Sequence, residues 1–522
     1  MLIRNCRLMK SANLNLKSFI INVNNSIFIC GFLLLIFQTS TFSQTKIEIL
    51  NADSVVYNRK IDRDLRKLIG NVIILHDSAY MYCDSGYLYK NTNSFEAYSN
   101  CHIQQGDTLD LYSDFFEYDG NIKLAKARQN VSLINKEIVL TTHFLDYDRQ
   151  NSIANYFNHG KIIDTTNILE SNSGYYFLKQ KEFFYKDSVV VTNPDYVILS
   201  DTLKYNTKSQ TTYFFGPTEI IGDSNLIYCE NGWYNTKTDI SQFNKNAYLI
   251  SNQHKLEGDS LYYNRSQEYG KAFENVTMTD TVENIILKGN YAEYFENSNY
   301  AMITDSALLM QISMNDTLFL HADTLLSNYN DTGKFQILQA FYKVKFFMAE
   351  MQGKCDSMVF ALSDSVIQMH KEPVIWSEEN QLTADYMEIH TKNSSPDHII
   401  MEKSAFIISQ EDEIRFNQIA GKKMYGHIKN NELYRVDVNG NGQTLYFPKD
   451  GNELTGINTA DASNLQIFIE DRKIKDILFL TKPDAHLVPI DQLKGDELKL
   501  KGFLWLQNHR PLEKYDIFIW ND

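Results

Sequence analysis

The stretch Leu50-Asn51-Ala52-Asp53-Ser54-Val55-Val56-Tyr57 begins a pattern that returns along the chain at a nearly constant interval. An apolar residue, a small residue, a polar anchor, and apolar residues two and four positions after the anchor recur every 28 to 33 residues. A period held this closely indicates one supersecondary unit stacked many times. The anchors are Asp53, Asp84, Asp114, His143, Ser173, Asp201, Glu230, Asp259, Asn290, Asp323, Asp356 and Asp385.

Each repeat is predicted to contain extended strands with a corner at the anchor. Leu111 and Ser113 precede Asp114 with a period of two, whereas Phe116 and Tyr118 follow it with the opposite parity. A period of two that slips by one residue is typical of a β-bulge or corner. Helical periodicity is hard to find after the first 43 residues. We therefore expect an all-β fold, an elongated stacked β-jellyroll or solenoid built from about twelve or more repeats of about 30 residues.

The acidic anchors are predicted to be structural. Carboxylate oxygens at a corner can accept hydrogen bonds from backbone N–H groups that the interrupted ladder leaves free. An active site with paired carboxylates needs two acids in different environments, whereas here the same acid recurs once per repeat. We assign the structural corner to Asp53, Asp84, Asp114, Asp201, Asp259, Asp323, Asp356 and Asp385.

The first 43 residues are predicted to be a cleavable signal peptide. They contain four basic residues and no acidic residue, followed by the apolar run Ile27–Phe37, which is too short to span a bilayer. We expect the repetitive region to cover residues 44–395. The period loosens after that point, so residues 396–522 are predicted to be a less regular C-terminal β section that continues and caps the stack, with Trp505 and Trp520 near its end.

Composition argues against several classes of function. A formal net charge of −15 disfavours nucleic-acid binding, because Lys and Arg supply most of the affinity for phosphate backbones. None of the twelve His residues pairs with a Glu at metal-ligand spacing, and no Gly-flanked Ser forms a nucleophile elbow. We therefore predict no enzyme activity, no catalytic residues, no metal and no cofactor.

The cysteines after the signal are predicted to be buried free thiols. Cys83, Cys229 and Cys355 each stand just before an anchor, where the other repeats carry a small residue. Repeats far apart in a stack are too distant for a disulfide. The pair Cys83 and Cys101 is the one for which a disulfide stays open.

The repeat resembles the OstA-like (LptA-like) family of organic solvent tolerance and lipopolysaccharide-transport proteins. The signature of that family is Ala-Asp-x-apolar-x-apolar, a turn, and Gly-Asn-Val-apolar. It stands here as Ala52-Asp53-Ser54-Val55-Val56-Tyr57 followed by Gly70-Asn71-Val72-Ile73. Weaker copies occur at Gly258-Asp259-Ser260-Leu261 and Ala384-Asp385-Tyr386-Met387, so the resemblance extends over residues 45–480.

The resemblance implies a periplasmic protein of outer-membrane assembly, with outer-membrane association as a further option. Its jellyroll, open along one side, would hold the acyl chains of lipopolysaccharide or a related lipid. Its partners would be other jellyroll transport proteins, joined edge to edge at the inner and outer membranes. The implied lipid-facing residues are Val55, Tyr57, Phe116, Tyr118, Leu203, Tyr205, Leu261 and Tyr263, although the same residues could instead fill a dry core.

Two other functions compete with a lipid bridge. The same repeats would suit a structural or adhesive exported β-solenoid that is not an enzyme. A carbohydrate-active solenoid ranks last, because no acidic cluster departs from the repeat register. An open apolar groove between the strands would favour the lipid bridge, whereas a filled interior would favour the structural solenoid.

Overall fold

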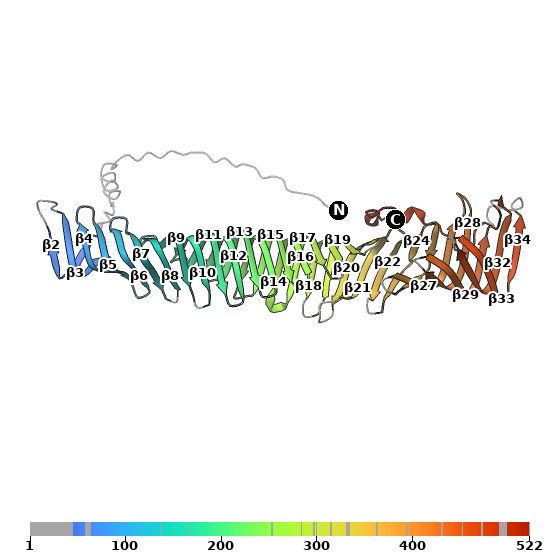
Figure 1. Ribbon diagram of the computed structural model, residues 1–522, viewed down its shortest axis with the longest axis horizontal. Coiled ribbons are helices and arrows are strands. Elements are labelled where there is room, and N and C mark those ends of the chain that lie inside the picture. Colours follow the sequence, from blue (N-terminus) through green and yellow to red (C-terminus); the bar gives the residue numbers. More distant parts are fainter. Residues whose placement is uncertain are drawn as a thin grey trace, which may run out of the picture.

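The computed structural model describes residues 45–520 except 58–63, 137, 165, 252–253, 283, 296–297, 299, 314–315, 330–334, 362–363, 393–394, 430–431, 452, 471–472 and 490–497. The predicted signal peptide lies outside the described residues. The strands follow one another in chain order along a single elongated stack, with β2 near one end and β34 at the other (Figure 1). The prediction of an elongated all-β repeat fold is therefore confirmed.

The sheet is built mostly of strands of ten to sixteen residues. The first strands are β1 (Glu48–Asn51), β2 (Ser54–Val56), β3 (Leu65–His76), β4 (Ala79–Tyr89), β5 (Ser94–Gln105), β6 (Leu109–Asp119), β7 (Leu124–Asn135), β8 (Ile138–Asp148), β9 (Ile153–Ile163), β10 (Ile168–Phe177) and β11 (Glu182–Asn193). The middle strands are β12 (Tyr196–Asn206), β13 (Thr211–Gly222), β14 (Asn225–Asn235), β15 (Ile240–Ser251), β16 (His254–Asn264), β17 (Tyr269–Asp280), β18 (Ile285–Phe295), β19 (Tyr300–Ile312), β20 (Thr317–Tyr329), β21 (Phe335–Phe347) and β22 (Gln352–Ala361).

The last strands are β23 (Val366–His370), β24 (Val374–Ser377), β25 (Asn380–Thr383), β26 (Tyr386–Lys392), β27 (Ser395–Gln410), β28 (Phe416–Lys429), β29 (Glu432–Tyr446), β30 (Lys449–Asp450), β31 (Glu453–Leu454), β32 (Gly456–Glu470), β33 (Lys473–Thr481) and β34 (Asp484–Pro489). Within the described ranges, the 3-10 helices η1 (Arg265–Gln267), η5 (Gln507–His509) and η6 (Asp516–Phe518) accompany them.

All strands except the β30–β31 hairpin belong to one antiparallel sheet of 32 strands. From β3 to β22 each strand pairs with the strand before it and the strand after it, so two strands form one repeat. Farther on, β23 and β24 pair with different halves of β22, and they are the two halves of one bent strand. At a spacing of about 4.8 Å between strands, the stack is about 130 Å long.

Every long strand bends in its middle, and the bends fold the sheet into a V. In β5 the bend falls at Ser99 and Asn100, which both have positive φ and together lie opposite the single residue Asp114 of β6. Such an extra residue is a β-bulge, which interrupts the ladder and turns the strand. We call the row of bends the spine, and the side that carries the hairpin turns the open edge.

The V has two walls. Each arm contains one half of every long strand. Arm A contains the halves equivalent to Ser94–Tyr98 of β5 and its paired segment Phe115–Asp119 of β6. Arm B contains the halves equivalent to Cys101–Gln105 of β5 and its paired segment Leu109–Ser113 of β6. One continuous cluster of buried apolar side chains runs between the arms from Ile47 to Ile467. Burial alternates along β4 and changes parity at Asp84, as the slip in the sequence pattern predicted.

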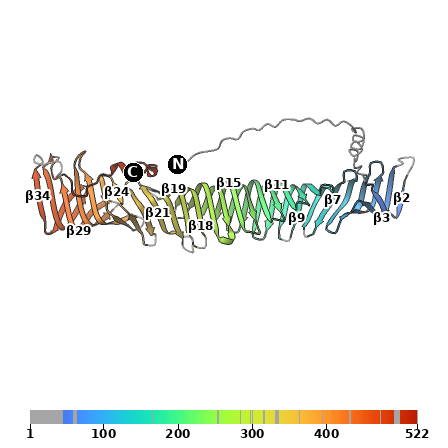
Figure 2. The same cartoon turned by 180° about the vertical axis from the view of Figure 1, so that it is seen from behind.

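The C-terminal segment, residues 498–520, runs back along the outside of the stack instead of covering its end (Figures 1 and 2). Buried glutamines on the outer face of arm B bind its backbone. The amide of Gln381 donates to Leu504 O at 2.7 Å and accepts from Leu506 N at 2.7 Å, and Gln418 makes the same pair of bonds to Leu498 and Leu500, both at 2.8 Å.

Aromatic and basic side chains complete the attachment of this segment. The Trp505 ring packs against Phe416 with ring centroids 5.0 Å apart. The Trp520 ring lies beneath the ammonium groups of Lys345 and Lys354. The segment therefore covers the outer face from β28 back to β20, and the strands themselves continue through residues 396–489.

Candidate functional site: an apolar trough between the arms

The carboxylates of the predicted corner lie along the spine, with solvent on one side. Asn100 Nδ2 donates to Asp84 Oδ2 at 2.8 Å, and Asn130 Nδ2 donates to Asp114 Oδ2 at 2.6 Å. The same bond joins Asn71 to Asp53 at 2.9 Å and Asn275 to Asp259 at 3.0 Å. The bonding partner is therefore the side chain of the left-handed Asn on the neighbouring strand, where the sequence had suggested backbone N–H groups.

The other corner acids have different partners. Lys343 and Lys371 approach Asp323 and Asp356 at 3.8 and 2.9 Å. Hydrogen bonds from the Ser357 hydroxyl and from Lys371 lower the pKa of Asp356. Asp201 lies beside Gly216, and the backbone N–H of Asp385 donates to Lys403 O at 3.0 Å. These contacts tie neighbouring strands together at the spine, away from the space between the arms.

The open edge is closed over β3–β10, which we call the closed section. Tyr118 on arm A reaches across to His76 on arm B, with 2.7 Å between its hydroxyl and His76 Nδ1. Arg149 Nη1 donates to the same hydroxyl at 2.6 Å and its Nη2 donates to His76 O. The Arg149 side chain is only 7% exposed and forms no ion pair with any described residue. This network joins the two arms at their free ends.

Two further tyrosines repeat the bridge at intervals of 29 residues. Tyr147 donates its hydroxyl to Gln105 Oε1 at 3.0 Å, and Tyr176 accepts from Asn135 Nδ2 at 2.8 Å. Burial raises the pKa of both Tyr118 and Tyr147 to about 12. The interior of the closed section is filled by these rings and their apolar neighbours.

The first described residues also cross the open edge of the closed section. Ile47 N donates to Asn93 Oδ1 in a turn of arm A at 3.0 Å. The backbone carbonyl of Thr45 lies 3.0 Å from His76 Nε2, and its hydroxyl donates to Asp77, both on arm B. The salt bridge between Lys123 and Asp77, at 2.7 Å, joins the arms again. Entry from the open edge is therefore blocked in this section.

The interior becomes accessible over β12–β18, which we call the half-open section. Met81, Leu111 and Leu140 in the closed section are buried, whereas their equivalents Ile227 and Leu256 are half-buried. The equivalents at the two ends of this section, Ile198 and Leu287, are buried. The half-buried inner residues of this section are Tyr205, Ile220, Ile227, Tyr234, Leu249, Leu256, Tyr263 and Met278. Tyr234, the equivalent of Tyr118, donates its hydroxyl to Asp239 in its own arm at 3.0 Å. The Tyr234 hydroxyl therefore does not bridge the arms.

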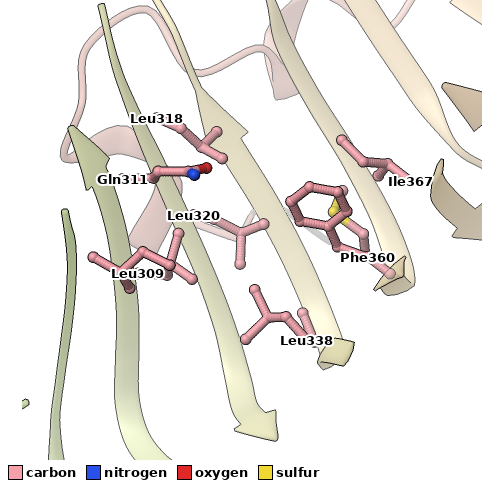
Figure 3. Close-up of a pocket in the computed structure, with 10 residues that line it drawn as sticks. Leu309, Gln311, Leu318, Leu320, Leu338, Phe360 and Ile367 are labelled. Atoms are coloured by element: carbon pink, nitrogen blue, oxygen red, sulfur yellow. The ribbon is translucent and has the colours of Figure 1, made fainter. Parts of the chain in front are cut away.

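An apolar pocket continues the trough beyond the half-open section. It has a volume of about 40 Å³ and lies between the arms from β18 to β23 (Figure 3). Arm B contributes Ile285, Leu309, Gln311, Leu318 and Leu320, and arm A contributes Leu338, Ala340, Met358, Phe360 and Ile367. Gln311 is the one polar side chain among these ten.

The sequence-predicted lining residues fall into three environments. Phe116 and Tyr118 are buried in the closed section, and Leu203 and Leu261 are buried deep between the arms. Tyr205 and Tyr263 are half-buried in the trough. Val55 and Tyr57, by contrast, lie at the first edge of the stack, where they are 45% and 54% exposed.

Several pocket residues were not singled out from the sequence. Leu309, Gln311, Leu338 and Ala340 lie on β19 and β21, the strands of each repeat that carry no anchor. The signal that could have located these strands is the pair of left-handed residues at their bend, such as Asp305 and Ser306. Such pairs recur in most repeats and alternate with the anchors, whereas the bend of β13 has Gly216 alone at positive φ.

The cysteines of the described region are buried free thiols. Cys83, Cys101, Cys229 and Cys355 are free and buried, and burial raises the pKa of Cys83 and Cys101 to about 12. Across the described ranges, no three His, Cys, Asp or Glu side chains are grouped to hold a metal ion. Within the same ranges, no helix has the length and apolarity needed to cross a membrane.

Comparison with known proteins supports the resemblance deduced from the repeat. Residues 44–201 and 196–259 match the model of the OstA-like protein family, so the resemblance to that family is confirmed over these residues. The crystal structure of LptH, the LptA homologous periplasmic component of the conserved lipopolysaccharide transport device from Pseudomonas aeruginosa, is 11% identical over a match that covers 23% of this chain and 84% of LptH, with a TM-score of 0.20. No curated protein sequence matches this chain.

Proposed function

We propose, from the premise that residues 44–259 form OstA-like repeats, that this protein is a periplasmic lipid-carrying bridge in lipopolysaccharide transport and outer-membrane assembly. Acyl chains of lipopolysaccharide or a related lipid would lie between the arms, and head groups would remain at the open edge in water. The observation that carries this proposal is the change from a latched interior in β3–β10 to a half-exposed apolar interior in β12–β18, continued by the pocket of β18–β23.

The physical argument rests on the chemistry of the trough. Half-exposed apolar side chains in a continuous row gain free energy when an apolar ligand removes them from water, at about 25 cal/mol per Å². An acyl chain is long, narrow and apolar, and it matches a trough lined by Ile, Leu, Met and Tyr. The proposal includes no catalytic step, metal or cofactor.

The two ends of the stack support contact with other jellyroll proteins. Leu50, Val55 and Tyr57 are exposed at the first edge, and Leu480 and Leu487 are exposed at the last edge. Edge strands present unpaired backbone groups and are sites for strand addition. Val55 and Tyr57, which the family resemblance implies to be lipid-facing, lie at this edge outside the trough and suit an end contact.

The filled interior of the closed section favours the second candidate function, a structural or adhesive exported β-solenoid. In that case the half-exposed residues of β12–β18 would be an imperfectly packed core. The two functions differ in whether lipid enters the half-open section, so one experiment separates them.

The experiment is photocrosslinking in cells from a probe placed at Tyr205, Tyr263 or Leu318. Lys204 is the matched control, because its side chain lies on the outer face in an ion pair with Glu182 at 2.9 Å. A probe at Tyr147 tests the closed section. We expect lipid adducts at the three trough positions and none at Lys204 or Tyr147. Folded protein without lipid adducts at any trough position would overturn the proposal in favour of the structural solenoid.

A further inference from the structure

Two arginines occupy equivalent places in the repeat but have different surroundings. Arg149 follows Tyr118 by 31 residues, and Arg265 follows Tyr234 by the same interval. The backbone N–H of Arg149 donates to Lys123 O at 3.0 Å, and that of Arg265 donates to Asp239 O at 2.9 Å. Both arginines therefore start from the same position in a turn of arm A at the open edge.

The side chains of these arginines differ in what they bind. Arg149 is buried and donates to Tyr118, Gln105 and His76, and so it joins the arms. Arg265 is exposed, and its side chain has no hydrogen bond or ion pair with another described residue. The residue that stands where Gln105 would be is Ile221, which offers no acceptor. The second guanidinium thus lies at the rim of the half-open section with no partner among the residues that the structure describes.

Arg265 nonetheless lies near the trough. Burial raises the pKa of Tyr234 to about 12, the bond to Asp239 adds to that rise, and the nearby Arg265 charge opposes it. Tyr196, on the arm B side, also has its pKa raised by burial and opposed by Arg265. Tyr196 and Tyr234 belong to opposite arms and both pack against the interior cluster, so the charge of Arg265, in its turn at the open edge, acts on both walls of the trough.

Neighbouring turns of arm A add further positive charge. Lys208 and Lys237 are 29 residues apart in turns of the same geometry, since the side-chain oxygens of Asn206 and Asn235 each accept from the backbone N–H groups two and three residues later. Neither lysine side chain has an ionic or hydrogen-bonding partner among the described residues. Turns of one arm that are two strands apart are about 10 Å from each other. Lys208, Lys237 and Arg265 therefore form a basic row along arm A, which we call the basic rim.

The facing rim of arm B carries acidic residues. Asp164 and Asp195 lie in its turns and Asp223 follows in the next one, so an anion would be repelled from that side. Two acids lie in these turns of arm A. The Asp239 carboxylate accepts the Tyr234 hydroxyl, and Glu268 follows Arg265 in the same turn. The two rims thus present opposite charges to the mouth of the trough.

We propose that the basic rim formed by Lys208, Lys237 and Arg265 binds the anionic head group, a phosphate or carboxylate, of the amphiphile whose apolar chains occupy the half-open section. Guanidinium and ammonium groups form charge-assisted hydrogen bonds with these anions. Arm B would exclude the same head group by like-charge repulsion, so the amphiphile would enter in one orientation. This inference rests on the proposed lipid-carrying function and specifies the chemical class of its ligand.

The test compares two amphiphiles of equal chain length, dodecyl phosphate and dodecyl maltoside, each below its micelle concentration. Displacement of the neutral dye N-phenyl-1-naphthylamine from the purified full-length chain gives both dissociation constants, at low and at high salt. We expect the wild-type protein to prefer dodecyl phosphate by about tenfold at low salt, with the preference falling as salt rises.

Variants then assign that preference to the rim. The combined change Lys208→Gln, Lys237→Gln and Arg265→Gln should abolish the preference and leave the affinity for dodecyl maltoside unchanged. Lys186→Gln, Lys245→Gln and Lys288→Gln together remove the same charge from exposed positions on the outer face and spine, and they should keep the preference.

The outcomes separate the inference from the function on which it rests. Failure of both amphiphiles to displace the dye from the wild-type protein would refute the lipid-carrying function. Equal binding of the two amphiphiles, or an equal loss of preference in both triple variants, would overturn the basic rim alone.

Discussion

Replacement of Tyr118 by Phe tests whether the bridge between the arms holds the closed section together. The ring of Phe keeps the packing of this buried position, so the change removes only the hydroxyl. That hydroxyl accepts from Arg149 at 2.6 Å and lies 2.7 Å from His76 Nδ1, and both of these partners are buried. A bond to a charged group contributes about 1.5 to 3 kcal/mol and a neutral one about 1 kcal/mol. We therefore expect the free energy of unfolding of the closed section to fall by about 2 to 4 kcal/mol.

Hydrogen exchange is the suitable assay, because repeat proteins open locally and each repeat contacts only its neighbours. The loss of protection should be confined to the amides of β3–β8, with those of β27–β29 unchanged. Tyr112→Phe is the matched control, because Tyr112 is exposed on the outer face and stacks its ring on His102. That control should change the free energy of unfolding by less than about 0.5 kcal/mol. If Tyr118→Phe were as mild as Tyr112→Phe, the bridge would not be the element that closes this section.

Two further changes address other parts of the stack. Alkaline pH should destabilise the closed section, because burial raises the pKa of Tyr118 and Tyr147 from 10.0 to about 12. The protonated tyrosines contribute their full stability to the folded state below pH 10. That contribution is lost as the pH rises toward 12, by about 3 kcal/mol for each tyrosine. Tyrosinate absorbance should then rise together with unfolding measured by circular dichroism, and titration of these tyrosines near pH 10 in folded protein would contradict the assignment. Gln381→Ala should release residues 498–520, because it removes both bonds to Leu504 and Leu506 and leaves buried backbone groups unpaired, at a cost of about 2 kcal/mol. Limited proteolysis of the C-terminal segment measures this release, and Gln368→Ala, on β23 of arm A, is the control that should leave the segment protected.

The repeat and its corner could be predicted from the sequence because both depend on local chemistry. The small residue at Cys83 and the apolar residue at Met81 mark one face of a strand, and the parity change after Asp84 marks the bend. The corner partner was harder to predict. Asn100 lies 16 residues beyond Asp84, and the bond between them forms only when the neighbouring strand is in register.

The division into closed and half-open sections could not be read from the period. Tyr118 and Tyr234 occupy equivalent positions in the pattern, yet one bridges the arms and the other does not. The difference lies in residues at the ends of other strands, such as His76 and Gln105, which meet a tyrosine 42 residues later across the V. No local spacing rule identifies such partners. The path of residues 498–520 along the outer face could likewise not be predicted, because that segment contains no anchor pattern.

The attachment of the C-terminal segment has a consequence for how the molecule is made. Most strands pair with the strand that immediately precedes them, so the stack can grow in step with synthesis from β3 onward. The hydrogen bond from Lys345 to Ile519 O, however, joins residues 174 positions apart, and Gln381 likewise bonds Leu504 O. These bonds can form only after residues 498–520 have been synthesised. Until residues 498–520 have docked, Trp376 and Phe406 on the outer face of arm B stay uncovered. A nascent chain therefore exposes an apolar strip that this segment later covers, and docking of residues 498–520 is a late folding step.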